Sequence, residues 1–292
     1  IMNTSNIIKE DHRVYAGVFG CIMVLGLPLN AVSLWILLRR HSLRSPNAVF
    51  MINLALSDLL VIISLPMRIY FHATGTQTFG IMTCLINTMF FRNNIRSSAS
   101  FITFISVDRL LAVVYPLRSR HLRTSSNAWK GAALIWGVFL VVNIPEGIGF
   151  LKHLQNHTEH ICFQSHEYKS VTRSAIIYLQ IVLLVTMLAV NIVCTIMVCW
   201  TLHNHLSDSA KVNNKVNVML IFAINLVIFC TCFLPVPLHL ATKSNTRITP
   251  LACLTVLSCC LDPLMYYFSF DSFWKKKDKA QNQYWSLVIF RP

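Results

Sequence analysis

Charged side chains are scarce in this sequence: of its 292 residues, only 12% are Asp, Glu, Lys or Arg. A soluble domain carries roughly 25% charged residues, so this chain has too few to cover a water-exposed surface. Several of its apolar runs exceed the ~20 residues that cross a bilayer as a helix. No cleavable signal peptide is evident, because residues 1–13 are polar and the first apolar run is too long. These features exclude a soluble protein and predict a multi-pass membrane protein.

Acidic residues are scarcer still, with 11 Asp and Glu against 25 Lys and Arg, for a net charge of +14. Such a balance can indicate a nucleic-acid-binding protein, but here the positive charge follows the apolar runs. When seven spans are assigned, 14 Lys and Arg residues fall on one side of the membrane and seven on the other. The positive-inside rule then places the amino terminus outside the cell and residues 275–279 in the cytosol. We therefore expect membrane lipids, and no nucleic acid, as partners.

Internal repeats, low-complexity linkers and catalytic patterns are also absent. No nucleophile–His–acid set and no metal-ligand spacing occurs, so we expect neither an enzyme nor catalytic residues nor a cofactor. Transporters tend to show repeats with broken helices in matching halves, and none is visible. An ion-coupled transporter stays a distant alternative, because Asp58 and Asp262 lie within apolar spans.

The apolar runs predict an all-α membrane protein, a seven-transmembrane helix bundle with a short amphipathic eighth helix. The eighth helix is expected over residues 270–281, where aromatic side chains oppose lysines, as in a helix lying along the inner leaflet. We expect one domain over residues 1–282 and a tail of unassigned role over 283–292. The seven spans are predicted at about 14–39, 47–72, 81–115, 128–150, 171–202, 211–242 and 247–268.

One connection is too short for this arrangement. Only 27 residues separate Pro235 from Pro263. At about 1.5 Å per residue, the two helix segments use nearly all of them, whereas helix–helix connections usually take about two to eight residues. Either these helix ends are frayed or loop residues are absent from this sequence near 243–247, and we favour absent residues.

Two cysteines differ from the other eight, which lie in apolar helices. Cys84 and Cys162 fall near the predicted outer surface, where an oxidising environment favours a disulfide between them. Asn3 and Asn156 each begin an N-glycosylation sequon on the same face. All four residues agree with the topology derived from charge.

A different short motif lies on each of several successive helices: Gly26-Leu-Pro-Leu-Asn30, Asn53-Leu-Ala-Leu-Ser-Asp58, Cys84, Asp108-Arg109-Leu110, Trp136, Phe229-Cys-Thr-Cys-Phe-Leu-Pro235 and Asp262-Pro-Leu-Met-Tyr266. Each alone is a weak pattern, but in this order they resemble the rhodopsin-like (class A) G-protein-coupled receptors over about residues 14–280. Leu65-Pro-Met-Arg-Ile69 and the segment from Cys259 to Phe268 resemble the branch that holds the purinergic (nucleotide) and lysophosphatidic-acid receptors.

The resemblance implies a sodium site around Asp58 in the middle of the second span. Asn30, Ser98 and Asp262 would surround it, as in the resting state of this class. A buried carboxylate is costly unless it is neutralised or bound. The alternative is a protonated, hydrogen-bonded Asp58 with no ion.

The resemblance also implies a switch at the cytosolic ends of the helices. Arg109 would contact the G protein and would be restrained by Asp108 in the resting state. Leu117 would press into the G protein, and Tyr266 would swing inward on activation. The predicted switch residues are Asp108, Arg109, Leu117, Phe229, Phe233 and Tyr266.

The chain departs from the family pattern at four positions. Leu110 replaces the commoner Tyr, and Phe233 stands where many members have Trp. Met187 stands where the fifth helix usually has Pro, and Thr195 where it often has Tyr. We expect a fifth helix without its usual bulge and Arg109 without one active-state partner.

Three arginines, Arg68, Arg92 and Arg96, lie in the outer halves of apolar spans. Arg92 and Arg96 are four residues apart, so they share one helix face about 6 Å apart along the axis. Arginine cannot deprotonate, so each needs an anion, backbone carbonyls or water. One interpretation is that at least one of them holds a ligand phosphate or carboxylate. The other is a structural role, facing a water-filled cavity or paired with Glu146.

Arg68 is the strongest of these candidates, because it follows the proline of the second helix as in the lysophosphatidic-acid group. Phe91 stands where amine receptors carry Asp, which disfavours a cationic ligand. His239 belongs to an expected basic rim that would draw an anion inward. The predicted ligand-binding residues are Arg68, Arg92, Arg96, Phe91 and His239.

The resemblance therefore implies a plasma-membrane receptor with an extracellular amino terminus. It would bind an anionic lipid of lysophospholipid type or a nucleotide-like ligand, from outside or from the outer leaflet, and activate heterotrimeric G proteins. The alternatives are a carboxylate or oxidised fatty acid as ligand, and a receptor that is active without one. A retinal pigment is excluded, because no lysine for a Schiff base occurs between Lys243 and Lys275.

Overall fold

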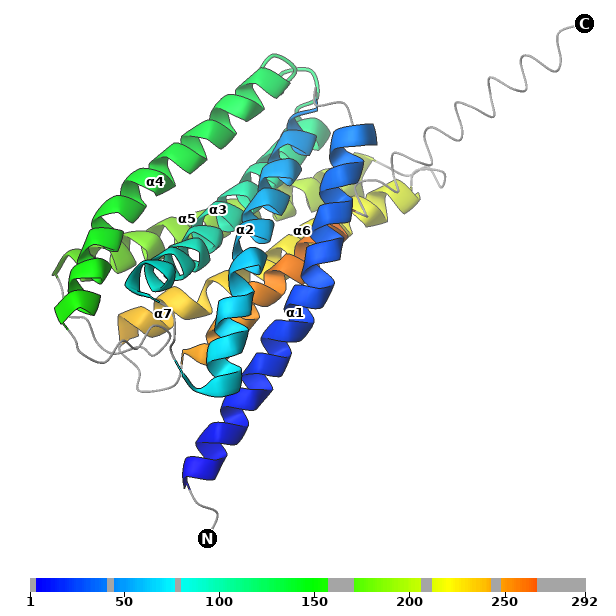
Figure 1. Cartoon of the computed structure of the whole chain (residues 1–292). Coiled ribbons are helices and arrows are strands. Elements are labelled where there is room, and N and C mark those ends of the chain that lie inside the picture. The colour runs from blue at the N-terminus through cyan, green and yellow to red at the C-terminus, as the bar shows by residue number, and fades with distance from the viewer. Residues whose placement is uncertain are drawn as a thin grey trace, which may run out of the picture.

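The computed structural model describes residues 4–40, 45–76, 80–156, 171–205, 212–242 and 248–266, and these are helical apart from short turns. Seven of its helical stretches are long and apolar enough to cross a membrane, which confirms the predicted fold class. The last of them, Thr249–Tyr266, is the orange helix in Figure 1. The others comprise α1 (Thr4–Arg40), α2 (Pro46–Thr74), α3 (Ile81–Val114), α4 (Ser125–Asn156), α5 (Val171–His205), α6 (Val212–Ile228), the π-helical turn η2 (Phe229–Phe233) and α7 (Pro235–Thr242).

The helices α1 and α4 are longer than the spans predicted from hydropathy. The membrane-crossing part of α1 begins at His12, although the helix itself begins at Thr4. Hydropathy marks only the apolar part of a helix. Once that part has formed, adding further residues to the helix is easy, so the helix can extend into the polar sequence beside it. The proposed eighth helix at 270–281, the tail at 283–292 and the short connection at 243–247 lie outside the described residues.

The sixth span, predicted as one helix over about 211–242, consists of α6, η2 and α7 in succession. The backbone N–H of Leu234 donates to the carbonyl of Phe229 at 3.3 Å, five residues back, which is the bond of a π-helix. Pro235 lacks an N–H, and its ring would clash with the carbonyl four residues earlier in a regular helix. Widening the helix by one residue relieves this conflict.

The helix α3 lies at the centre of the bundle and packs against α2, α4 and α5. Figure 1 shows α1 and α4 at opposite edges, with α2 and α3 between them. Side chains that face inward on α2 and α3 are mostly buried, and many of them are polar. The polar residues singled out in the sequence therefore lie in or beside the helix on which the others pack.

Two of the family motifs act through packing between helices. A Cβ atom on Gly26 would come within 3.0 Å of Ile62 Cδ1, so glycine permits the close approach of α1 to α2. Trp136 on α4 donates from Nε1 to Asn53 Oδ1 on α2 at 2.9 Å. The motifs thus align α1, α2 and α4 around the site described next.

Candidate functional site

Arg68 is buried between α2 and α3, with 7% of its surface exposed. Its Nε donates to Asn87 Oδ1 at 3.2 Å, and its guanidinium carbon lies 4.5 Å from the centre of the Phe91 ring. Asn87 in turn donates from Nδ2 to the carbonyl of Ser64 at 2.6 Å. This amide therefore orients the guanidinium, and the aromatic face of Phe91 stabilises its charge.

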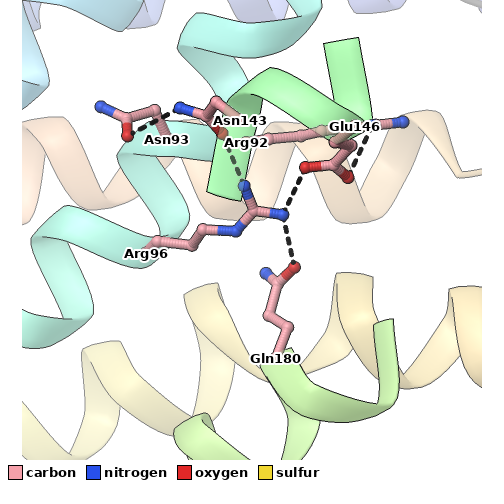
Figure 2. Close-up of polar contacts among 6 residues, drawn as sticks. All are labelled: Arg92, Asn93, Arg96, Asn143, Glu146 and Gln180. Atoms are coloured by element: carbon pink, nitrogen blue, oxygen red, sulfur yellow. Dashed lines mark hydrogen bonds and ion pairs between the residues drawn. The ribbon is translucent and has the colours of Figure 1, made fainter. Parts of the chain in front are cut away.

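Arg92 and Arg96 face α4 instead, where they share a single carboxylate (Figure 2). Arg92 Nη1 lies 2.7 Å from Glu146 Oε1, and Arg96 Nη2 lies 2.6 Å from Glu146 Oε2. Arg96 also donates to Asn143 Oδ1 at 2.7 Å and to Gln180 Oε1 at 3.3 Å. Through Arg96, the central helix α3 is therefore bonded to both α4 and α5.

The three arginines do not share their contacts. Arg68 meets the α3 face that carries Asn87 and Phe91, whereas Arg92 and Arg96 lie on the face toward α4. The ion pair with Glu146, which the sequence left open as an alternative for one arginine, is formed by both. His239 is half-buried on α7, and its backbone carbonyl accepts a hydrogen bond from Thr242 Oγ1 at 3.2 Å.

Asp58 is fully buried and receives hydrogen bonds from two helices. Its Oδ1 accepts from Asn94 Nδ2 at 3.1 Å, from Ser98 Oγ at 3.4 Å and from Cys259 Sγ at 3.5 Å. The structure thus brings Ser98 to Asp58 as predicted, and adds Asn94, which the sequence analysis missed. Asn94 lies one helical turn before Ser98, and this spacing could have indicated it.

Asn30 and Asp262 complete this region less directly. Asn30 donates to the carbonyls of Gly26 and Cys259, at 3.0 and 2.6 Å, and so reaches Asp58 only through Cys259. Asp262 is fully buried in the last described helix, three residues after Cys259, which donates to Asp58. Two buried carboxyl groups in one region cannot both stay charged at low cost unless a cation is bound or one of them is protonated.

Several oxygens around Asp58 receive no hydrogen bond from the described residues. These buried atoms are Oδ2 of Asp58, both carboxylate oxygens of Asp262, Oδ1 of Asn94 and Oδ1 of Asn30. A buried acceptor without a donor is costly and needs an explanation, such as an ion. A set made of carboxylate and amide oxygens suits a hard cation rather than a soft metal.

Asp108 was predicted to restrain Arg109. In the structure it is paired with a different arginine instead. Arg123, in the turn between α3 and α4, lies with Nε 2.9 Å from Asp108 Oδ1 and Nη2 3.2 Å from Asp108 Oδ2. Ser119 Oγ donates to the carbonyl of Leu111 at 3.0 Å and holds this turn against the end of α3. Arg109 Nε is buried without a hydrogen-bond partner among the described residues.

The other predicted switch residues differ in exposure. Leu117 is 88% exposed in the turn after α3, which leaves it free to contact a partner. Phe229 and Phe233 pack edge to face in the core, with ring centres 5.9 Å apart. Tyr266 is fully buried, and its hydroxyl has no hydrogen-bond partner in the described part of the chain.

The helix α5 is α-helical throughout Val171–His205, as expected from Met187 in place of Pro. Asn191, one turn after Met187, donates to Thr103 Oγ1 of α3 at 2.9 Å. Asn225 of α6 donates to Ser106 Oγ of α3 at 2.9 Å. These two amides connect α5 and α6 to the C-terminal half of α3, just before Arg109.

The predictions about the extracellular surface fall largely outside the described residues. Cys84 is buried near the start of α3, whereas Cys162 and Asn3 are not described. Asn156 is the last residue of α4, and its side chain is not described. The disulfide and the two glycosylation sites stay predictions.

Comparisons with known proteins agree with this arrangement. Residues 29–266 match the family model described as "7 transmembrane receptor (rhodopsin family)". The chain is 34% identical to lysophosphatidic acid receptor 6 of Mus musculus over 281 residues, which are 89% of this chain and 82% of that protein. It is 32% identical to lysophosphatidic acid receptor 4 of Homo sapiens, over 94% of this chain and 79% of the relative.

A third relative carries a different name. The uracil nucleotide/cysteinyl leukotriene receptor of Homo sapiens is 30% identical over 280 residues, covering 90% of this chain and 75% of that protein. The family match and these relatives agree with the motifs and with the seven spans. The chain therefore belongs to the rhodopsin family of seven-transmembrane receptors, which makes it a multi-pass membrane receptor that couples to G proteins, and not an enzyme.

Proposed function

We propose that this receptor binds an anionic lipid with a lysophospholipid-like headgroup, and that Arg68 holds the headgroup. The observation that carries the proposal is a buried guanidinium whose position is set by Asn87 and Phe91. A guanidinium held in this way can donate two parallel hydrogen bonds to a phosphate or a carboxylate without first being ordered. Two relatives whose names contain lysophosphatidic acid support a lipid phosphate.

A nucleotide-like ligand offers the same anionic chemistry and is supported by the relative named for uracil nucleotides. A carboxylate or oxidised fatty acid is favoured by a separate observation. Arg92 and Arg96 are paired with Glu146, while Arg68 lies on another face of α3. One guanidinium suffices for a carboxylate.

The experiment that tests the proposal is a titration of purified receptor, reconstituted with a heterotrimeric G protein, with three anion classes. We expect 1-oleoyl-glycerol 3-phosphate to stimulate GTP turnover at lower concentration than oleate or a uridine diphosphate. Uncharged 1-oleoyl-glycerol is the control for chain insertion. Stimulation by the uncharged lipid alone, or by none of the anions, would refute an anionic ligand.

For topology we propose that the amino terminus is extracellular. This proposal is supported by the excess of Lys and Arg on the opposite side of the assigned spans. Labelling of an amino-terminal epitope tag on intact cells tests it, and labelling that requires permeabilisation contradicts it.

We further propose that Asp58 and Asp262 hold an allosteric sodium ion, with Asn94, Ser98 and Asn30 nearby. The buried oxygens without donors support this donor set. The charge of a bound cation would balance the charge of one carboxylate. The hydrogen bonds of Asp58 with Asn94 and Ser98 would hold α2 and α3 in register.

Replacing Asp58 by Asn should therefore remove the dependence of receptor stability on sodium. We expect the thermal midpoint of the parent to be higher in sodium chloride than in choline chloride, and that of Asp58→Asn to be the same in both. Thr255→Val, which removes a different buried polar group in this half of the bundle, is the control and should keep the sodium effect. A sodium effect that survives in Asp58→Asn contradicts the proposed site.

The pairing of Asp108 with Arg123 predicts that Arg123→Ala lowers basal G-protein turnover. Without Arg123, the charge nearest to Asp108 is that of Arg109, so the restraint that the family pattern implies would form. The Asp108–Arg123 pair is partly exposed, so its loss should change basal turnover by a few-fold, about 1 kcal/mol. Arg120→Ala, an exposed neighbour in the same turn, is the matched control, and equal or higher turnover in Arg123→Ala would contradict the prediction.

A further inference from the structure

Arg109 carries a hydrogen-bond donor that the described residues leave without a partner. This donor is its Nε, which is buried. The adjacent carboxylate of Asp108 is bonded through both oxygens to Arg123, at 2.9 and 3.2 Å. A buried donor without an acceptor is costly, so an arrangement of the receptor that supplies an acceptor to Arg109 would be stabilised by the new bond.

Asn225 of α6 carries the complementary atom, an acceptor without a donor. The residue is 1% exposed, and its Nδ2 donates to Ser106 Oγ of α3 at 2.9 Å. Its Oδ1 is buried and receives no hydrogen bond from the described part of the chain. A side-chain amide donates from its nitrogen and accepts at its oxygen independently. Asn225 can therefore accept from a second group without releasing Ser106.

The residue that holds Asn225 lies one helical turn before Arg109. Ser106 precedes Arg109 by three residues, or about 4.5 Å along the axis of α3. Residues three apart are neighbours on a helix surface, and side chains lean toward the helix N-terminus, so that of Arg109 leans toward the level of Ser106. Leu110, next to Arg109, packs in the same apolar cluster as Phe222, which lies one turn before Asn225. The helix α6 therefore runs alongside α3 at the level of Arg109.

The contacts of α5 are less suited to supply the acceptor. Oδ1 of Asn191 also lacks a donor among the described residues, but its amide is bonded to Thr103, six residues and about 9 Å before Arg109 along the axis. Thr195, which stands where the family often has Tyr, donates its hydroxyl to the carbonyl of Asn191 at 2.7 Å. Its side chain is also much shorter than that of tyrosine. Of the two amides that bond to this half of α3, Asn225 is the one beside Arg109.

We propose that Asn225 is a positioning residue for G-protein coupling, whose Oδ1 accepts a hydrogen bond from the Arg109 guanidinium when the receptor binds the G protein. It thereby takes the place of the tyrosine that Thr195 replaces. The guanidinium has five N–H donors, so it can bond to Asn225 and still contact the G protein. A charged donor makes this bond stronger than one between neutral groups. The inference goes beyond the proposed function, because it assumes nothing about the ligand.

The test measures the dissociation constant between the purified full-length receptor and a nucleotide-free G protein, with no ligand added. The G protein is the heterotrimer that gives the parent its highest basal turnover. Asn225→Leu removes the acceptor at similar side-chain volume, and we expect binding to weaken about tenfold, as for the loss of one hydrogen bond to a charged group. Asn225→Asp keeps an acceptor at this position and should bind the G protein at least as tightly as the parent.

Two matched controls separate this role from a structural one. Ser106→Ala removes the partner of Nδ2 but keeps Oδ1 of Asn225, and Asn191→Leu removes the amide that α5 places on α3. Both variants lose a buried hydrogen bond between helices, so their thermal midpoints should fall about as far as that of Asn225→Leu. Their binding of the G protein should stay within about twofold of the parent.

A double-variant cycle tests the pairing itself. Arg109→Met has no donor at a similar side-chain length, so adding Asn225→Leu to it should weaken binding of the G protein by less than about twofold, because the two changes remove the same bond. Full additivity of the two losses would overturn the inference.

Parent-like binding by Asn225→Leu also overturns the inference. So does a loss of binding in Ser106→Ala or Asn191→Leu that equals the loss in Asn225→Leu, since the effect is then structural. If Asn225→Leu does not fold, Asn225→Ala takes its place in every comparison. A loss of binding in Asn225→Asp as large as that in Asn225→Ala overturns the inference, because the acceptor is then not what matters.

Discussion

Replacing Arg68 by Ala should reduce the potency of the receptor's anionic ligand by about 100-fold, because truncating one partner of a buried charged pair costs about 2–5 kcal/mol. The guanidinium is buried and already ordered by Asn87 and Phe91, so little entropy offsets the interaction that is lost. The measurement is the concentration of 1-oleoyl-glycerol 3-phosphate that half-maximally stimulates GTP turnover, with receptor number set equal by quantifying purified protein.

Two further variants separate the charge of Arg68 from its geometry. Arg68→Lys keeps the charge but loses the planar fork, and we expect an intermediate loss of about tenfold. Asn87→Ala keeps the guanidinium but removes the acceptor that orients it, with a loss of similar size. If Arg68→Ala responds like the parent while Arg92→Ala does not, the headgroup lies on the α4 side of α3 and the assignment of Arg68 is wrong.

Replacing Glu146 by Leu should destabilise the receptor by about 3–5 kcal/mol, the range for breaking a buried ion pair from one side. Leucine has a similar volume but leaves the guanidinium groups of Arg92 and Arg96 without the carboxylate that they share. Neither arginine can become neutral to escape this cost. The measurements are the thermal midpoint of the receptor in detergent and the number of receptors at the cell surface.

The matched control for Glu146→Leu is Gln180→Ala, which removes one neutral acceptor 3.3 Å from Arg96. We expect that change to cost about 1 kcal/mol. The double variant Glu146→Leu with Arg96→Leu should recover part of the lost stability, because it removes one of the unpaired charges. Equal stability of Glu146→Leu and Gln180→Ala would show that the ion pairs do not hold α3 to α4.

These two predictions assign different roles to two buried charged residues, Arg68 and Glu146. Replacing Arg68 is expected to change ligand potency far more than receptor stability. Replacing Glu146 is expected to change receptor stability first. Both residues contact α3, the central helix, whose C-terminal half also carries Arg109 and the contacts of Asn191 and Asn225. A ligand bound at Arg68 and a G protein bound at Arg109, as proposed, would therefore act on the same helix.

Much of the fold and part of the site could be predicted from the sequence alone. Hydropathy over stretches of ~20 residues is a local property, so it located the seven spans without any knowledge of their packing. Asp58 and Ser98 were predicted to meet, and they do, because the motifs on α2 and α3 place them at matching depths. Arg68 was singled out by the proline two residues before it, which is also local.

The tertiary structure alone decided which ionic groups meet. Glu146 is 50 residues from Arg96 along the chain, and Arg123 is 15 residues from Asp108, so no periodicity connects either pair. Whether an arginine faces a ligand or a carboxylate depends on the rotation of α3 and α4 about their axes, and that rotation is set by packing over the whole bundle. The sequence by itself determined a seven-helix receptor with costly charges in its outer half, and only the packing of the helices decided that two of those charges are held by Glu146 while Arg68 lies on a separate face.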